Sequence, residues 1–171
     1  MTRLTGFLLC FFLSITAYAA NMTLTSKAFV EDITIPVLYT CDGKDISPDL
    51  SWSNIPKNTK SLAIVLSDKD APNGIFYHWV IFNIPANVQA FAQDLQQLPS
   101  GSVVGNNSWD RSRYNGPCPP KGALHHYVFT LYALDKKLSL SEKTNAPSLI
   151  KAMQGHILQQ ATLNTAFARW P

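Results

Sequence analysis

Titratable side chains and backbone donors gather in two stretches of the sequence, Leu62–Pro85 and Tyr114–Leu134. The side chains in them that could do chemistry are Asp68, Asp70, His78, His125 and Tyr127. A loop rich in glycine and proline, Gly116–Gly122, comes just before the last two and can add backbone N–H groups. Histidine rings, a tyrosine hydroxyl and loop amides are all donors that suit a phosphate. We expect the two stretches to meet and form one small anion pocket.

Two other chemistries are open to the same residues. Two histidines and a carboxylate are adequate zinc ligands, although they come from separate strands without the short paired spacing of zinc motifs. Histidine and aspartate also serve acyl transfer, but no G-x-S-x-G motif accompanies them, and Ser67 beside Asp68 is a poor nucleophile. The residue types alone are therefore compatible with anion binding, zinc binding or acyl transfer.

A carboxylate beside a bound phosphate needs an explanation, because like charges repel. Asp68 would be useful if it oriented a histidine, or if burial raised its pKa so that it shared a proton with the ligand. Either role predicts an affinity that depends on pH. Asp70 has a plainer alternative, since residues 70–74 read as a surface turn in which this carboxylate caps backbone amides.

The apolar run that begins at Leu62 predicts a strand leading to the two acids. Asp68 and Asp70 share one parity, so a strand that continues past Asp68 projects both carboxylates from the same face. The sequence therefore predicts that the two acids act together.

The next strand, Phe76–Ile84, is apolar on both faces, which is typical of a strand in the middle of a sandwich. Strict alternation groups His78 with Val80 and Phe82 on one face. Taken alone, a histidine in this position is more often a core residue than a functional one.

The strand after the proline-rich loop carries the second histidine of the site. His125 and Tyr127 fall on one face and His126 on the other. We therefore expect His125 and Tyr127 to reach the pocket, and His126 to reach it only if the strand is bulged.

Weaker patterns predict the remaining elements. Pro36 places its strand at an edge or bulge, and Pro147 suits the first turn of an amphipathic helix. The predicted elements are strands at Met22–Phe29 and Ile33–Tyr39, a short helix near Gln89–Leu98, a helix at Pro147–Leu163 and a last strand at Leu163–Trp170.

Length, composition and charge limit the kinds of protein that this chain can be. The chain has 171 residues, 46% of them hydrophobic, which is enough for a proper core. A net charge of +3 without a cluster of basic residues makes nucleic acid an unfavoured partner.

The N-terminus resembles an export signal. An early Arg3, the apolar run Phe7–Ile15 and the small-x-small triplet Ala17-Tyr18-Ala19 predict a signal peptide over residues 1–19, cleaved after Ala19. The apolar run is short for a transmembrane anchor. We therefore expect a periplasmic or secreted protein with one domain over residues 20–171.

Cys10 would be lost with the signal, which leaves Cys41 and Cys118 in an oxidising compartment. An even number of cysteines there favours a disulfide, and two buried free thiols are the alternative.

Four motifs in this order resemble the phosphatidylethanolamine-binding protein family, also called Raf kinase inhibitor-like proteins, in its bacterial branch. The motifs are D-K-D-A-P at 68–72, H-W-V at 78–80, G-P-C-P-P-K-G at 116–122 and H-H-Y at 125–127. The resemblance covers nearly the whole chain after the signal, from Leu24-Thr25-Ser26 to the helix that contains G-H-I-L.

The resemblance implies an antiparallel β-sandwich with peripheral helices and a small pocket for phosphate or a phosphorylated head group. It implies pocket roles for Asp68, Asp70, His78, His125 and Tyr127, and a pocket wall of Gly116, Pro119 and Pro120. Family members bind ligands or inhibit kinases and proteases, and bacterial members are often homodimers.

Three positions depart from the family pattern. Lys69 replaces the usual proline between the acids, His126 replaces the usual arginine after the first histidine, and Thr165 stands at a usual glycine near the tail. A cation near the rim favours a more charged ligand, whereas Thr165 bears only on a local bend.

We therefore expect an exported, non-enzymatic binding protein that holds a phosphorylated or other small anion and needs no cofactor, with inhibition of a kinase or protease as a further action. One alternative is a hydrolase or metal-dependent enzyme that uses the same Asp and His residues. Another is a protein-interaction module with a vestigial pocket.

Overall fold

The computed structural model describes residues 20–170 of the chain, so the predicted signal peptide and Cys10 lie outside the described residues. The elements are, in chain order, β1 (Thr23–Thr25), the 3-10 helix η1 (Val37–Tyr39), β2 (Leu50–Ser53), β3 (Ser61–Asp68), β4 (Phe76–Pro85), β5 (Ala90–Phe91), β6 (Val103–Val104), β7 (Leu124–Leu134), α1 (Ala146–Met153) and β8 (Ile157–Ala168).

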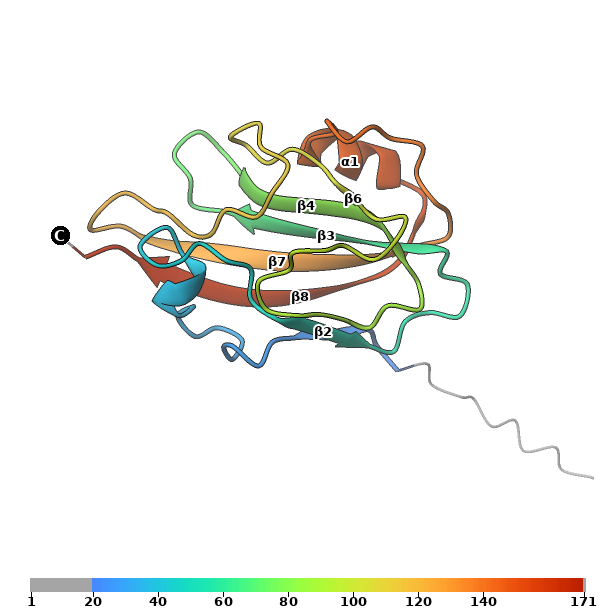
Figure 1. Cartoon of the computed structure of the whole chain (residues 1–171), viewed down its shortest axis with the longest axis horizontal. Coiled ribbons are helices and arrows are strands. Elements are labelled where there is room, and N and C mark those ends of the chain that lie inside the picture. Colours follow the sequence, from blue (N-terminus) through green and yellow to red (C-terminus); the bar gives the residue numbers. More distant parts are fainter. Residues whose placement is uncertain (1–19, 171) are drawn as a thin grey trace, which may run out of the picture.

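The strands form two antiparallel sheets (Figure 1). The small sheet has the order β1-β2-β5, and the large one has the order β6-β4-β3-β7-β8. The small sheet lies against one face of the large sheet, and α1 covers part of the other. The predicted fold class, a mainly β antiparallel sandwich with a peripheral helix, is confirmed.

Burial explains why the central strands read as continuous apolar runs. β3 is paired on both sides, by β4 and β7, and nearly all of its residues are buried. Its residues alternate between a core shared with the small sheet, which contains Ile64 and Leu66, and a core shared with α1, which contains Ala63 and Val65. β8 is an edge strand of the large sheet and alternates between buried and partly buried positions in its second half.

The segment around Pro36 differs from its prediction. Ile33–Tyr39 does not form a strand: Thr34 makes one isolated bridge to Ala166, and η1 follows. Proline has no N–H for a strand ladder, and the Pro36 carbonyl instead accepts from Tyr39 N at 3.0 Å. The strand predicted at Met22–Phe29 is also shorter and covers only Thr23–Thr25.

The helix predicted near Gln89–Leu98 is wrong. Ala90 and Phe91 instead form β5 and pair with β2. Asp94 has a φ of 54°, which a right-handed helix cannot include, and Ser47 accepts from its backbone N–H at 2.9 Å. Pairing with a distant strand therefore overrides the local preference.

The helix predicted at Pro147–Leu163 is half its expected length. α1 begins after the cap residue Asn145, whose side chain accepts from Ser148 N, and ends at Met153. Gly155 then takes a φ of 78°, and β8 begins at Ile157, well before the predicted start at Leu163. The apolar spacing in the second half of this segment fits a half-buried strand as well as a helix, and pairing with β7 decides for the strand.

The predicted disulfide between Cys41 and Cys118 is confirmed, with the two Cα atoms 5.4 Å apart. Cys41 N also donates to the Pro117 carbonyl at 3.1 Å. The turn-rich segment after η1 is thus fixed to the proline-rich loop that precedes β7.

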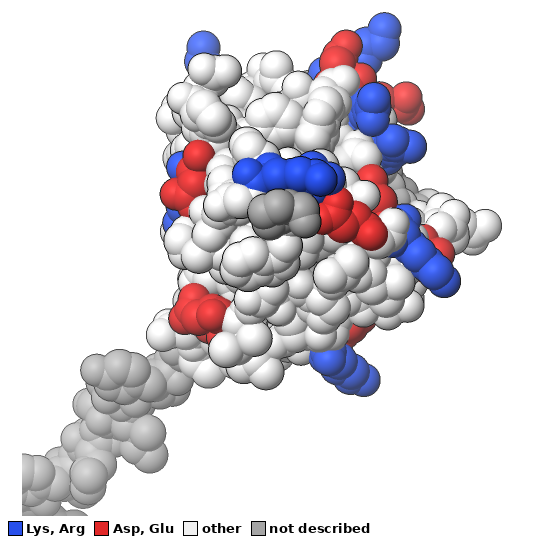
Figure 2. Space-filling view, turned by 90° about the vertical axis from the view of Figure 1, so that its left-hand side faces the viewer, with Lys and Arg blue, Asp and Glu red and all other residues white. Residues whose placement is uncertain are grey.

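Charged side chains are dispersed on the end of the molecule where β3 finishes and β7 begins. Figure 2 shows Lys and Arg among Asp and Glu around a largely uncharged surface on that face, without a continuous basic patch. Within residues 20–170, no helix is long and apolar enough to cross a membrane.

Removing the disulfide should cost stability, because it cross-links residues 77 positions apart. In the chain-entropy account, the free energy of unfolding of the double variant Cys41→Ser/Cys118→Ser should be about 4 kcal/mol lower than that of the wild type. Urea unfolding followed by fluorescence measures the difference. Wild-type protein unfolded in the presence of a reductant should match the variant, and equal stability of oxidised and reduced protein would contradict the prediction.

Candidate functional site

A β-bulge in β4 turns His78 toward the other candidate residues. Leu66 pairs with Trp79 and Ser67 pairs with Tyr77, so His78 has no partner on β3. Strict alternation would place His78 with Val80 and Phe82 on the side of α1, but the bulge changes this direction. The His78 ring instead packs edge-on against the Tyr127 ring, with the centroids 5.3 Å apart.

The buried His78 ring is held by two carbonyl groups. Its Nδ1 lies 3.0 Å from the Asn115 oxygen and 3.0 Å from the Gly116 oxygen. A carbonyl oxygen only accepts, so Nδ1 carries the hydrogen and Nε2 is the acceptor of the neutral ring. Burial lowers the pKa of His78 below its ordinary value, which keeps the ring neutral at pH 7.

Asp68 and His125 form a buried pair. His125 Nδ1 donates to Asp68 Oδ2 at 2.7 Å, and both side chains are more than nine-tenths buried. The other carboxylate oxygen, Oδ1, accepts from Asp70 N at 2.9 Å. Asp68 therefore orients His125, which is the first of the two roles expected for it, and His125 Nε2 is left free for a ligand.

The Tyr127 hydroxyl lies between these groups. Tyr127 is fully buried, and its oxygen makes no hydrogen bond of ordinary geometry with any group of residues 20–170. Burial, with the nearby Asp68 charge, raises the pKa of the phenol far above its usual value, so the hydroxyl stays protonated. A buried O–H donor without an acceptor is costly.

Aromatic side chains that the sequence interpretation missed form one wall of the site. The Trp109 ring packs against His78 and Phe76, with centroids 5.1 and 4.6 Å away. Trp109 is also partly exposed at 38%. A tryptophan within the polar loop N-N-S-W-D is the sequence signal that could have identified it.

The loop Gly116–Gly122 supplies fewer amides than expected. Three of its residues are prolines, which have no N–H. Gly116 N donates to Asp45 Oδ1 at 2.6 Å, and Gly122 N donates to the Arg169 carbonyl at 2.7 Å. The amides of Gly116 and Gly122 are therefore not available to a ligand, whereas the amide of Cys118 lies near the Tyr127 hydroxyl.

The wall residues of this loop lie at different depths. Pro119 is buried, whereas Pro120 is exposed. Gly116 is required by packing, since a Cβ there would lie 1.9 Å from the Tyr39 carbonyl oxygen. The Gly116 carbonyl contributes by holding His78.

Asp70 does not join the buried cluster. β3 ends at Asp68, so the shared parity of the two acids does not apply beyond it. Asp70 Oδ2 accepts from both His126 N and His126 Nδ1 at 2.7 Å, and these hydrogen bonds lower the pKa of Asp70. Asp70 and the outward-facing His126 thus form an exposed pair at the rim.

Asp45 and Asn107 position the site and were not predicted. Asp45 accepts from Asn115 Nδ2 at 2.9 Å as well as from the Gly116 amide. Asn107 is buried, donates to Asn115 Oδ1 at 2.9 Å, and accepts from Trp109 N at 3.0 Å. Together they fix the carbonyls that hold His78 and the start of the aromatic wall.

Thr165 pairs with Tyr127 across β7 and β8 without a break in register. Its hydroxyl donates to the Ile33 carbonyl at 2.6 Å. Residues 20–170 contain no group of three His, Cys, Asp or Glu placed to hold a metal ion. The arrangement as a whole places the Tyr127 hydroxyl beside the rings of His78 and His125, whose Nε2 atoms make no hydrogen bond within residues 20–170.

Burial of His78 predicts a stability that falls in acid. Because its pKa is lowered from 6.5 in the folded state, the unfolded chain takes up this proton first. The stability that the neutral His78 ring contributes to the fold is fully present above about pH 6.5. It is lost as the pH falls toward the lowered pKa of His78. Urea unfolding at pH 7.5 and 5.0 should show a larger loss of stability for the wild type than for His78→Gln, and an equal loss in both would contradict this account.

Known proteins resemble this chain in sequence over most of its length. The family model described as phosphatidylethanolamine-binding protein matches residues 25–168. A UPF0098 protein of Methanothermobacter thermautotrophicus is 44% identical over 151 residues, which cover 86% of this chain and 99% of the relative. A UPF0098 protein of Chlamydia trachomatis is 40% identical over 147 residues, covering 83% of this chain and 95% of the relative.

Two solved structures have the same fold. The phosphatidylethanolamine-binding protein homologue CT736 of Chlamydia trachomatis superposes with a TM-score of 0.81 at 38% identity, covering 87% of this chain and 98% of that one. Escherichia coli YbcL, described as a new member of the mammalian family, gives 0.82 at 29% identity, covering 87% and 99%. With sequence, fold and relatives in agreement, the chain belongs to the phosphatidylethanolamine-binding protein family.

Proposed function

We propose that this protein is an exported, non-catalytic binding protein whose pocket holds a phosphate-like anion that carries one hydrogen. The observation that supports this most directly is the Tyr127 hydroxyl, which is buried, protonated and without a hydrogen bond of ordinary geometry, although the Asp68 carboxylate lies nearby. A ligand oxygen at this place would satisfy it. The Nε2 atoms of the two histidines that flank Tyr127 are free for the same ligand.

The groups around Tyr127 suit a ligand that has both a hydrogen-bond acceptor and a hydrogen-bond donor. Tyr127 O–H donates, whereas His78 Nε2 accepts because its Nδ1 carries the hydrogen. A phosphate ester in its monoanionic form has charged oxygens for the first contact and one P–O–H for the second. A fully deprotonated anion would leave His78 Nε2 facing an oxygen lone pair.

The Asp68 carboxylate is compatible with an anionic ligand. Both of its oxygens already accept hydrogen bonds, one from His125 and one from the backbone of Asp70. When His125 is protonated, the pair carries no net charge, and His125 Nε2 becomes a charged donor to the ligand. Asp68 therefore acts as the partner of His125 and does not contact the anion.

Binding is favoured over hydrolysis by the groups around the histidines. In residues 20–170, no hydroxyl or thiol hydrogen-bonds a histidine of the site, as the nucleophile of a hydrolase does. Export is supported by the Cys41–Cys118 disulfide, which suits an oxidising compartment. Inhibition of a kinase or protease and a homodimeric state enter this proposal through the family resemblance alone.

Substitutions in the pocket should separate binding from folding. We expect His125→Ala and Tyr127→Phe each to weaken the binding of O-phosphoethanolamine and of inorganic phosphate about tenfold or more. Each substitution removes a hydrogen bond to a charged group. Tyr127→Phe should leave the free protein as stable as the wild type or more so, since it removes an unsatisfied hydroxyl. Calorimetric titration and urea unfolding measure the two effects.

The neighbouring His126→Ala is the matched control, because its ring faces outward and pairs with Asp70. Its affinity should stay within about twofold of the wild type. If His78→Ala and His125→Ala both bind phosphate as the wild type does, this pocket is not the anion site. Turnover of a phosphate ester that Asp68→Ala abolishes would instead support an enzyme.

The required hydrogen predicts a preference for phosphate over sulfate. Phosphate esters have a second pKa of about 6, so the monoanionic form becomes scarce as the pH rises, whereas sulfate carries no hydrogen at any pH tested. Because the monoanionic fraction falls from about one half at pH 6 to about one hundredth at pH 8, we expect phosphoethanolamine affinity to fall about fiftyfold more than sulfate affinity over this range. The change with sulfate reports the protein groups alone, and identical pH profiles for the two ligands would rule out the hydrogen bond to His78.

A further inference from the structure

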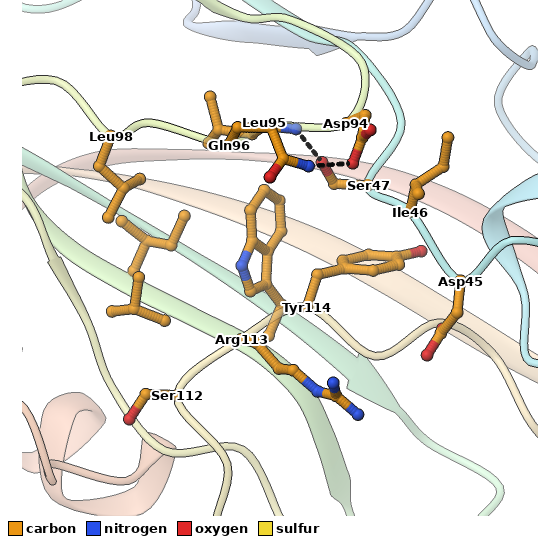
Figure 3. Close-up of a pocket in the computed structure, with 13 residues that line it drawn as sticks. Asp45, Ile46, Ser47, Asp94, Leu95, Gln96, Leu98, Ser112, Arg113 and Tyr114 are labelled. Carbon is orange, nitrogen blue, oxygen red and sulfur yellow. Dashed lines mark hydrogen bonds between the residues drawn. The ribbon is translucent and has the colours of Figure 1, made fainter.

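A second cavity, of about 530 Å³, opens beside β4 (Figure 3). Trp79 and Ile81 of β4 form its floor, and Leu95 and Leu98 form one side. Residues 45–47 and 112–114 also line it, and Ser47 lies beside Leu95, whose backbone N–H donates to the Ser47 hydroxyl (Figure 3). The volume is within the usual range of small-molecule sites. Seven apolar or aromatic side chains and six polar or charged ones line the cavity.

Arg113 is the charged group of this cleft that is free to bind a ligand. No carboxylate of residues 20–170 lies within ion-pair distance of its guanidinium. The two acids of the cleft already have donors: Asp45 accepts from Asn115 and Gly116, and Asp94 accepts from Gln96 Nε2 at 2.7 Å. Figure 3 shows Asp94 on the far side of the cleft from Arg113.

We propose that this cleft is a second ligand site, for a small amphipathic carboxylate whose apolar body lies along Leu95, Leu98 and Trp79 and whose carboxylate pairs with Arg113. The guanidinium presents two N–H groups in the geometry that suits a carboxylate. The apolar body would remove the partly exposed Leu95 and Leu98 from water.

The cleft and the anion pocket share a wall. Arg113 Nε donates to Asn115 Oδ1 at 3.3 Å, and the Asn115 carbonyl is one of the two that hold His78 Nδ1. Asp45 lines the cleft and fixes both Asn115 and Gly116. A ligand that engages Arg113 therefore changes the contacts of the residue that positions His78, and this linkage rests on the anion pocket proposed above.

The test titrates the whole exported chain with 4-phenylbutyrate and follows backbone amide shifts by NMR. We expect saturable shifts at residues 95–98 and 112–115. Arg113→Gln should weaken the binding about fivefold, whereas the uncharged 4-phenylbutanol should bind the wild type and Arg113→Gln alike. The matched control is Arg111→Gln, which removes an exposed arginine that does not line the cleft.

Three outcomes would overturn the site: no saturable binding at millimolar probe, equal affinity in wild type and Arg113→Gln, or shifts confined to the surroundings of His125. A phosphate titration at saturating phenylbutyrate tests the linkage, with an expected change in phosphate affinity of at least twofold. Unchanged phosphate affinity would overturn the linkage alone. Absent phosphate binding would overturn the anion pocket and leave the cleft to be judged by the amide shifts.

Discussion

The direction of the His78 side chain is the constraint on which the candidate site depends. Between two regular register pairs, β4 contains one residue more than β3, and that residue is His78. A regular strand would send the ring into the core beside α1, where its Nδ1 would have no carbonyl partner. The bulge instead places the ring against Tyr127 and beside the carbonyls of Asn115 and Gly116.

His78 keeps these contacts only if the loop that contains Asn115 and Gly116 is held in place beside the β4 bulge. The Cys41–Cys118 disulfide and the hydrogen bond from Cys41 N to Pro117 fix the loop from one side. Asp45, whose backbone has a φ of 56°, fixes it from the other side through Asn115 and Gly116. Rigid groups lose little freedom when a ligand binds, so in the proposed anion pocket the loop would contribute to affinity by holding its neighbours in place.

Two of the three departures from the family pattern, Lys69 and His126, lie at the rim, whereas Thr165 is buried and pairs with Tyr127 across the sheet. His126 faces outward and pairs with Asp70, which takes that carboxylate away from the buried cluster. Lys69 is exposed between the two acids. The rim of the candidate site therefore carries Lys69, Asp70 and His126, above an interior formed by Asp68, His125, His78 and Tyr127.

Much of the site could be predicted from the sequence, because strand parity is local. The alternation of side chains along a strand predicted that His125 and Tyr127 share one face and that His126 lies on the other. The prediction holds because β7 is regular over these residues. Parity failed for His78 and for Asp70, because a bulge and a strand end are decided by neighbouring strands. Trp109, Asn107 and Asp45 come from loops, whose side chains have no periodicity that would reveal their direction.

By itself, the sequence determined the sandwich class and the central strands, since continuous apolar runs are buried in any fold. It favoured a disulfide between Cys41 and Cys118 without deciding it. Only the tertiary structure decided that β8 begins at Ile157, that Gln89–Leu98 is not helical, and that Asp68 serves His125 while Asp70 serves His126. Each of these outcomes depends on a partner distant in sequence. Hydrogen bonds between distant segments override local preference wherever the local signal is weak.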